Sequence, residues 1–150
     1  MRALHEILAE QVGQSYFSDW VLIDQPMIDR FAEATADHQY IHVDPVRAAG
    51  TPFGGTVAHG MLTLSLLPAF SASLARPRID GVRMRINYGF DRVRFVHPVR
   101  SGSRLRMAAT IAGIVEKRPG RFQQVMDVTI EVEGEHIPAL TATWITQFLV

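Results

Sequence analysis

The residues best suited to chemistry lie in one short segment, A-T-A-D-H-Q-Y-I-H-V-D-P, which covers residues 34–45. In it Asp37 and His42 are separated by only four residues. A carboxylate and an imidazole close together can hold one water, from which the carboxylate accepts a proton while the imidazole orients the water or returns a proton. The spacing alone leaves a structural alternative open, because Asp37 could simply cap a helix end or form an Asx-turn.

The same segment also offers a possible metal site. His38 and His42 are separated by three residues, and Asp44 follows closely. The segment lacks an H-E-x-x-H pattern, however, and Gln39 and Tyr40 favour an extended conformation between the histidines rather than a helix. We therefore expect no metal ion here, and no cofactor.

A second motif, P-F-G-G-T-V-A-H-G-M-L-T-L-S-L-L-P at residues 52–68, places glycines before a strongly apolar stretch that predicts a helix. The first N–H groups of a helix have no partner within it. The N–H of Gly60 could therefore stabilise the developing negative charge on a thioester oxygen. The alternative is a plain helix start with small residues for close packing. His59 could contact a ligand, although a hydrogen-bonded structural histidine explains it more simply.

The third motif, R-I-N-Y-G-F-D-R-V-R-F-V-H-P-V-R-S-G at residues 85–102, alternates arginine with apolar residues. This alternation predicts a strand with one basic face. Such a face suits phosphate groups, since guanidinium pairs well with them. We take Asn87, Tyr88 and Arg94 as candidates for substrate binding, together with Gln39. A solvated strand face that discourages aggregation is the competing interpretation.

The surrounding pattern predicts the elements that hold these residues. Helices are expected over residues 3–11, 25–35 and 59–75, the second capped by Asp24 and the third kinked or ended by Pro68. One helical turn is expected over residues 45–50, within a loop from 35 to 60. Strands are expected over residues 16–23, 82–90, 92–95, 103–117, 121–133 and 137–149. We predict one α+β domain over residues 1–150, with a buried central helix wrapped by a curved antiparallel sheet. Its uncovered edge strand makes a homodimer the physical expectation.

Composition excludes several classes of protein. The 150 residues include no cysteine, which rules out disulfide frameworks, thiolate catalysis and cysteine zinc sites. Formal net charge is zero, against the basic excess expected of a nucleic-acid-binding protein. No signal-peptide core occurs at the N-terminus, and the longest apolar run is too short to span a bilayer. We expect a cytoplasmic protein without nucleic-acid or membrane partners.

Taken in order, the loop motif, the glycine-led helix and the arginine-rich strand resemble the MaoC-like dehydratases, the group that contains (R)-specific enoyl-CoA hydratases. The resemblance covers most of the chain and implies a hotdog fold, a dimer and an acyl-CoA substrate. It implies that Asp37 and His42 are catalytic and that Gly60 supplies the oxyanion N–H. The expected reaction is hydration of a trans-2-enoyl-CoA to the (R)-3-hydroxyacyl-CoA, and its reversal.

The chain departs from the family's usual loop motif, S/T-G-D-x-N-P-x-H. Ala36 replaces a glycine, and Gln39-Tyr40 replaces Asn-Pro. Pro68 stands where some members have a serine in the central helix, so no third catalytic side chain is expected. Hotdog folds also include acyl-CoA thioesterases, and a non-catalytic acyl-thioester-binding subunit is a further alternative.

Overall fold

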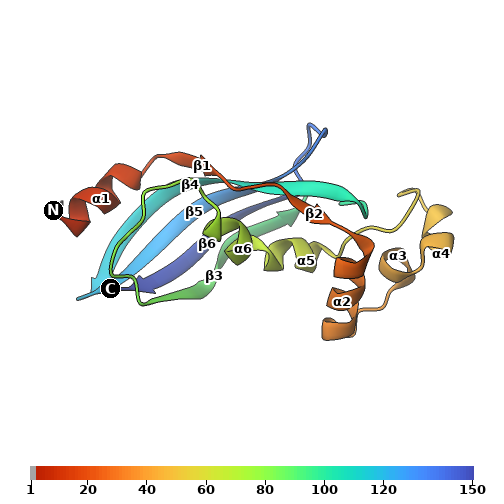
Figure 1. Cartoon of the computed structure of the whole chain (residues 1–150), viewed down its shortest axis with the longest axis horizontal. Coiled ribbons are helices and arrows are strands. Elements are labelled where there is room, and N and C mark those ends of the chain that lie inside the picture. Colours follow the sequence, from red (N-terminus) through yellow and green to blue (C-terminus); the bar gives the residue numbers. More distant parts are fainter. Residues whose placement is uncertain (1–2) are drawn as a thin grey trace.

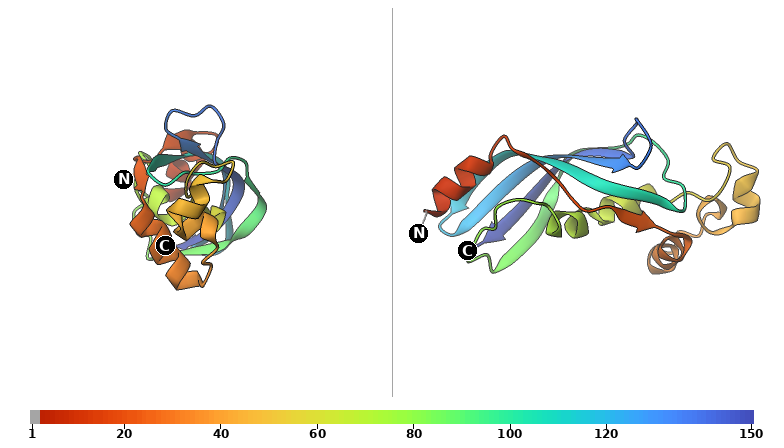
Figure 2. Two further views of the ribbon diagram at one scale, coloured as in Figure 1. Left: turned by 90° about the vertical axis from the view of Figure 1, so that its right-hand side faces the viewer. Right: turned by 45° about the horizontal axis from the view of Figure 1, so that its top comes forward.

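The computed structural model describes residues 3–150 and contains one antiparallel sheet (Figure 1). Its strands follow the order β1-β4-β5-β6-β3, and β2 also pairs with β4. The bounds are β1 Ser15–Phe17, β2 Val21–Ile23, β3 Met84–Phe95, β4 Ser103–Arg118, β5 Arg121–Val132 and β6 Leu140–Leu149. The sheet curves strongly, and β3 forms one of its edges (Figure 2).

Six helices accompany the sheet in the described residues. Their bounds are α1 Leu4–Gln11, α2 Gln25–Thr35, α3 Tyr40–Val43, α4 Pro45–Ala49, α5 Gly60–Ser65 and α6 Leu67–Ala72. Helices α5 and α6 lie against the concave face of the sheet, whereas α2, α3 and α4 gather beyond one of its ends (Figures 1 and 2). None of these helices is long and apolar enough to cross a membrane. The arrangement confirms the predicted α+β class.

The main core fills the space between the sheet and the α5–α6 segment. It joins Leu67 and Phe70 to the inward-facing residues of the strands, among them Met107, Ile130 and Leu140, all of which are fully buried. The alternation of buried and less buried residues along β5 is regular, as period-two patterning requires. Burying each large apolar side chain contributes about 1.5–3 kcal/mol.

The predicted long central helix is divided in two. Its regular hydrogen bonding stops at Leu66. Helix α6 begins at Leu67, and Pro68 lies in its first turn, where a missing N–H costs nothing. The break therefore confirms the predicted effect of Pro68. The expectation that this segment is buried nearly all round is wrong for the single chain. Met61 is 57% exposed, because no element of the same chain covers that face.

Three further boundaries differ from those predicted. Residues 16–23 form two short strands, β1 and β2, that contact different parts of β4. Residues 82–90 and 92–95 merge into the single strand β3, whose register against β6 shifts at two places. Residues 40–43 form the helical turn α3, not the predicted extended segment, and the N–H of Asp44 bonds the Tyr40 carbonyl to close it.

Candidate functional site

Helix α2 carries Asp37 to its position. The Asp24 carboxylate caps the helix start by accepting a hydrogen bond from the Met27 N–H at 3.0 Å. The helix ends at Ala36, which adopts the left-handed conformation with φ 60° and ψ 21°. This residue is the one non-glycine position with positive φ in the part of the chain that the structure describes. The turn at Ala36 reverses the chain, so that Asp37 follows it at an exposed position.

His42 lies in α3 with only 8% of its surface exposed. Its Nδ1 is 2.6 Å from the carbonyl oxygen of Val57. A carbonyl can only accept a hydrogen bond, so Nδ1 must carry the proton in that bond. Neutral His42 therefore has an unprotonated Nε2, which is free to accept a proton or a hydrogen bond.

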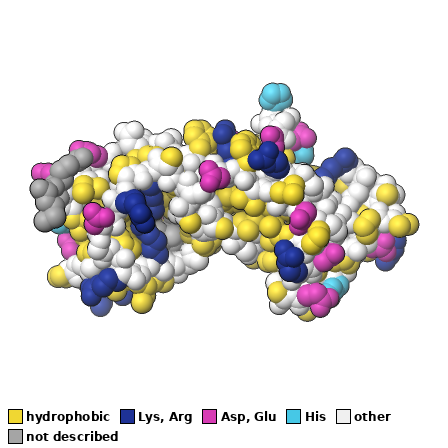
Figure 3. Space-filling model, in the orientation of Figure 1, with side chains coloured by type: hydrophobic (Ala, Val, Ile, Leu, Met, Phe, Trp, Pro, Cys, Tyr) yellow, Lys and Arg dark blue, Asp and Glu magenta, His cyan; other side chains and the backbone are white. Residues whose placement is uncertain are grey.

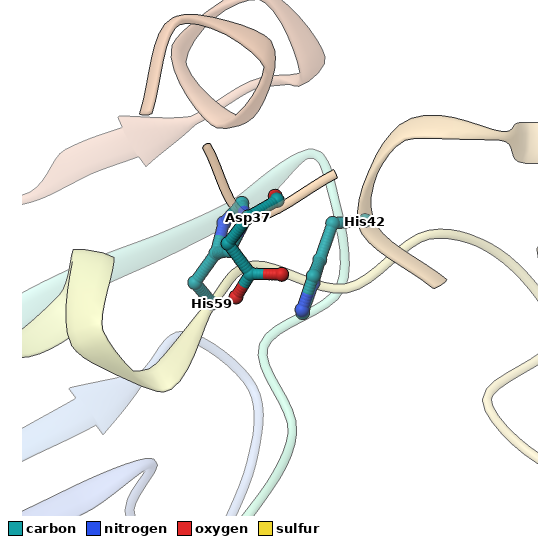
Figure 4. Close-up of side chains that lie close together, drawn as sticks. All are labelled: Asp37, His42 and His59. Atoms are coloured by element: carbon teal, nitrogen blue, oxygen red, sulfur yellow. The ribbon is translucent and has the colours of Figure 1, made fainter. Parts of the chain in front are cut away.

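His59 joins this pair from a distant part of the sequence (Figure 4). Its ring stacks on His42 with centroids 3.8 Å apart, and its Nε2 donates to the backbone carbonyl of Asp37 at 2.9 Å. The ligand-type atoms of Asp37, His42 and His59 all lie within 4.8 Å of one another. The buried Nδ1 of His59 has no hydrogen-bond partner among the described residues. Figure 4 shows the three side chains gathered at one point.

Burial is the main influence on the charge of His42. Desolvation lowers the pKa of His42 below its usual 6.5, and the nearby His59 acts in the same direction. The Val57 carbonyl and the Asp37 carboxylate raise that pKa, with a smaller net effect. At neutral pH the imidazole is therefore mainly uncharged and can act as a base.

Gln25 fixes the three segments that meet at the site. Its side-chain N–H₂ donates to the carbonyl of His42 at 2.7 Å and to Asp29 at 2.8 Å. Its side-chain oxygen accepts from the hydroxyl of Thr56 at 2.5 Å. The Val57 N–H in turn donates to the Ile41 carbonyl. Helix α2, helix α3 and the segment before α5 are thus held in one arrangement.

The cluster suits a water molecule better than a metal ion. A metal is bound in the plane of each imidazole at about 2.0–2.1 Å. The rings of His42 and His59 stack with only 23° between their planes, so their in-plane nitrogens do not converge on one ion. The other candidate ligands lie elsewhere: His38 is 3.7 Å from Glu33, and Asp44 caps α4 through the Arg47 N–H.

Gly60 is the first residue of α5 and directly follows His59. No described residue accepts its backbone N–H, as expected at a helix start. The ring of Phe95 covers this position closely, since a Cβ added to Gly60 would lie 2.8 Å from Phe95 Cδ1. A cavity of about 190 Å³ opens here, lined by Gly60, Thr63, Phe95 and neighbouring residues.

The remaining candidates for substrate binding are scattered. Gln39 is exposed at the start of α3, and its backbone N–H is 3.4 Å from the Asp37 carboxylate. Asn87 lines a cavity beside α6 and accepts a hydrogen bond from Trp144 at 3.1 Å. Tyr88 is 63% exposed at a register shift of β3. Arg94 bonds the carbonyl of its neighbour Val93 and lies outside these cavities.

Sequence reasoning did not anticipate two parts of the site. The stacking of His59 on His42 and the clamping by Gln25 join segments at least 17 residues apart. A local pattern carries no signal for such pairs. The available hint was His59, which the sequence marked as a hydrogen-bonded structural histidine, in agreement with its bond to the Asp37 carbonyl. Gln25, between Asp24 and Pro26, gave no signal of its own.

Comparison with known sequences gives a consistent result. The family described as "MaoC like domain" matches residues 8–136. The chain is 49% identical over 148 residues to "Nodulation protein N" of Rhizobium meliloti, covering 95% of this chain and 91% of that protein. It is 46% identical over 140 residues to "3-hydroxyacyl-thioester dehydratase Z" of Mycobacterium tuberculosis, covering 93% and 89% respectively.

The fold also matches solved structures. The (R)-hydratase from A. caviae involved in PHA biosynthesis superposes with a TM-score of 0.73 at 24% identity. The match covers 90% of this chain and 94% of that one. The predicted hotdog fold is thereby confirmed.

Proposed function

Because the chain belongs to the MaoC-like dehydratase family, we propose that it hydrates trans-2-enoyl-CoA to (R)-3-hydroxyacyl-CoA and catalyses the reverse dehydration. The observation that carries this proposal is the close approach of Asp37 to His42, whose Nδ1 is already bonded to Val57. Two proton acceptors, a carboxylate and an imidazole Nε2, then face one small space. Such a pair can bind and deprotonate water without a metal ion.

The water has a defined orientation in this arrangement. Asp37 and the Nε2 of His42 accept its two hydrogens, which directs an oxygen lone pair away from both. That lone pair attacks C3 of the enoyl group, forming the C–O bond as one O–H bond breaks. The released proton passes to the Asp37–His42 pair, and the pair returns a proton to C2 on the same side. The reverse sequence eliminates water.

The thioester oxygen gains negative charge as C3 is attacked. In the proposal the N–H of Gly60 donates to that oxygen, since this N–H has no acceptor among residues 3–150 and Gly60 directly follows His59. Glycine suits this place because a Cβ would lie 2.8 Å from Phe95 Cδ1 and would fit only if that half-exposed ring moved. His59 acts as a positioning residue, which holds the Asp37 backbone and the His42 ring.

Replacing Asp37 by asparagine tests the acid–base assignment. A positioned acid–base group contributes about two to four orders of magnitude in rate, so Asp37→Asn should lower kcat for crotonyl-CoA at least about a hundredfold. The change exchanges a carboxylate for an amide of the same shape at an exposed position, so the folded state should persist. Loss of the enoyl absorbance measures turnover, and Asp80→Asn, at an exposed turn, is the matched control.

Full activity of Asp37→Asn would refute the assigned role. The same assay separates the alternatives for the wild-type protein. Release of free thiol without loss of the enoyl group would identify a thioesterase. Binding of crotonyl-CoA with neither reaction would identify an acyl-thioester-binding protein.

We also propose that the protein works as a homodimer joined along β3. Within the described part of the chain this edge strand pairs only with β6, and its neighbourhood exposes apolar side chains. They include Met61, Met84, Tyr88 and Phe95, each more than half exposed. Light scattering at assay concentration should give twice the chain mass, and a monomer of full activity would contradict the proposal.

A further inference from the structure

A groove runs along one face of the α5–α6 segment, between it and strands β3 and β6. Three cavities of about 190, 120 and 390 Å³ adjoin one another there. The first and second share Pro68, Asn87 and Trp144, and the second and third share Pro68 and Ser71. The cavity at Gly60 shares no lining residue with these three, but Leu64, which lines the first of them, lies one helical turn beyond Gly60.

The two ends of this groove differ in character. The end beside α5 is mainly apolar, with Leu64, Leu67 and Phe90 beside Trp144. Its far end is basic, because Arg76 and Arg85 both line the second and third cavities. Figure 3 shows basic side chains beside the segment that joins α6 to β3. From Gly60 to Ser71 the helical rise of α5 and α6 gives a length of at most about 16 Å, because the two helices are separated by the break at Leu66.

The two arginines lack an anionic partner within the described chain. Arg76 donates to the neutral side-chain oxygen of Gln124 at 3.0 Å, and Arg85 lies over the ring of Phe148. Neither takes part in an ion pair with the described residues. Burial lowers the pKa of Arg76 to about 10, and the neighbouring Arg85 acts in the same direction. Arg76 is half-buried and Arg85 is exposed, and two neighbouring guanidinium groups favour the binding of an anion between them.

The backbone holds Arg76 in place before any ligand arrives. Its own N–H donates to the Leu74 carbonyl, and the preceding residue bonds the carbonyl of Phe17 in β1. Gln11 of α1 donates to the carbonyl of Pro77 at 3.4 Å. Ile79 is buried against Leu8 and Phe122 in a second core cluster. The segment is therefore tethered on both sides of the arginine.

We infer that Arg76 and Arg85 form an anion-binding subsite for the acyl thioester, at the basic end of the groove along α5 and α6, whose apolar end at Leu64 lies one helical turn from Gly60. The inference rests on the proposed function for the identity of the ligand. The anion that reaches this subsite is either a phosphate of the pantetheine carrier or a carboxylate at the distal end of the acyl chain. An extended pantetheine arm and an extended dodecanoyl chain both have about the length of the groove.

Equilibrium binding tests the subsite without relying on turnover. The ligands are dodecanoyl-CoA, dodecanoyl-pantetheine, which lacks the nucleotide phosphates, and dodecanedioyl-CoA, which adds a distal carboxylate. All three are saturated and cannot be hydrated. Titration calorimetry compares wild type with Arg76→Gln and Arg85→Gln. Arg118→Gln, which removes an exposed charge at the β4–β5 hairpin, is the control.

For a phosphate, Arg76→Gln should weaken dodecanoyl-CoA binding about tenfold and leave dodecanoyl-pantetheine unchanged, a loss equivalent to about 1.4 kcal/mol. For a distal carboxylate, wild type should bind dodecanedioyl-CoA about tenfold more tightly than dodecanoyl-CoA, and Arg76→Gln should abolish that difference. Arg76→Lys should restore part of the affinity in either case.

Changes below about twofold in all three affinities for both variants, like those of Arg118→Gln, would overturn the subsite. Urea unfolding of each variant identifies a loss of fold, and Arg85→Gln provides a second test if Arg76→Gln is unstable. Absence of hydratase activity in the wild type would refute the proposed function while leaving this binding comparison valid.

Discussion

Replacing Ala36 by glycine should stabilise the protein. Ala36 has φ 60°, and a left-handed conformation costs a non-glycine residue about 1–2 kcal/mol. Glycine avoids that strain but loses about 0.5–1 kcal/mol more conformational entropy on folding than alanine does. Ala36 is exposed, so its methyl group contributes little packing. The net gain in unfolding free energy should be about 0.5–1 kcal/mol.

A matched control is available two residues earlier. Ala34 is also exposed, but it lies within α2, where its backbone is helical. Ala34→Gly should therefore lower the unfolding free energy by about 1 kcal/mol. The same chemical change should thus have opposite signs at the two positions, for a difference of about 1.5–2 kcal/mol.

Urea unfolding at one fixed protein concentration measures both variants, since association alters apparent stability. The Tm of Ala36→Gly should rise by about 1–4 °C. Hydratase activity should stay within about twofold of wild type, because the backbone path to Asp37 is unchanged. An Ala36→Gly protein no more stable than wild type, or as unstable as Ala34→Gly, would refute the strain argument.

Four other predictions concern the site. Gly60→Ala places a methyl group 2.8 Å from Phe95, whose half-exposed ring can turn aside, so the unfolding free energy should change by about 1 kcal/mol or less in urea unfolding. The variant keeps the backbone N–H but crowds the space beside it, so kcat/KM should fall about tenfold. Unchanged kcat/KM would contradict a close approach of the thioester to residue 60. The acid limb of kcat/KM should lie below pH 6.5, because burial lowers the pKa of His42. Between that lowered pKa and 6.5 the unfolded chain binds more protons than the folded protein, so the unfolding free energy should fall as the pH decreases through this window. An NMR titration of the His42 ring with a midpoint above 6.5 would disprove both expectations. Asp37→Asn should move that midpoint lower, since the carboxylate raises it. Gln25→Ala leaves the His42 carbonyl and the buried Thr56 hydroxyl without their hydrogen bonds, so the unfolding free energy measured in urea should fall by about 1–3 kcal/mol. A loss no larger than that for replacing an exposed glutamine would argue against a role of Gln25 in holding the three segments together.

Local sequence patterns predicted much of the fold. Asp24 and Pro26 marked the start of α2, and the structure places its bounds at the predicted residues. Period-two alternation located β4 and β5 to within one residue at each end. These features depend on neighbours in sequence, through caps, turns and the alternation of faces. The break before Pro68 was predictable for the same reason, because proline lacks the N–H that the helix needs.

Patterns failed where distant segments compete with local preference. Gln39 and Tyr40 favoured an extended segment, yet α3 forms a turn of helix. The reason lies in tertiary contacts, since the segment is held by Gln25 from α2 and by Val57 from the strand-like segment before α5. Such bonds offset a weak local preference that no neighbouring residue reinforces.

The sequence by itself determined which groups are available: a carboxylate at Asp37, an imidazole at His42 and a glycine at the start of an apolar helix. It could not determine their states. Only the tertiary structure decided that His42 carries its proton on Nδ1, because the carbonyl that accepts it belongs to Val57, 15 residues away. Only the fold brought His59 onto His42, and Arg76 beside Arg85. Side-chain chemistry is a property of the residue, whereas protonation, burial and pairing depend on neighbours that folding supplies.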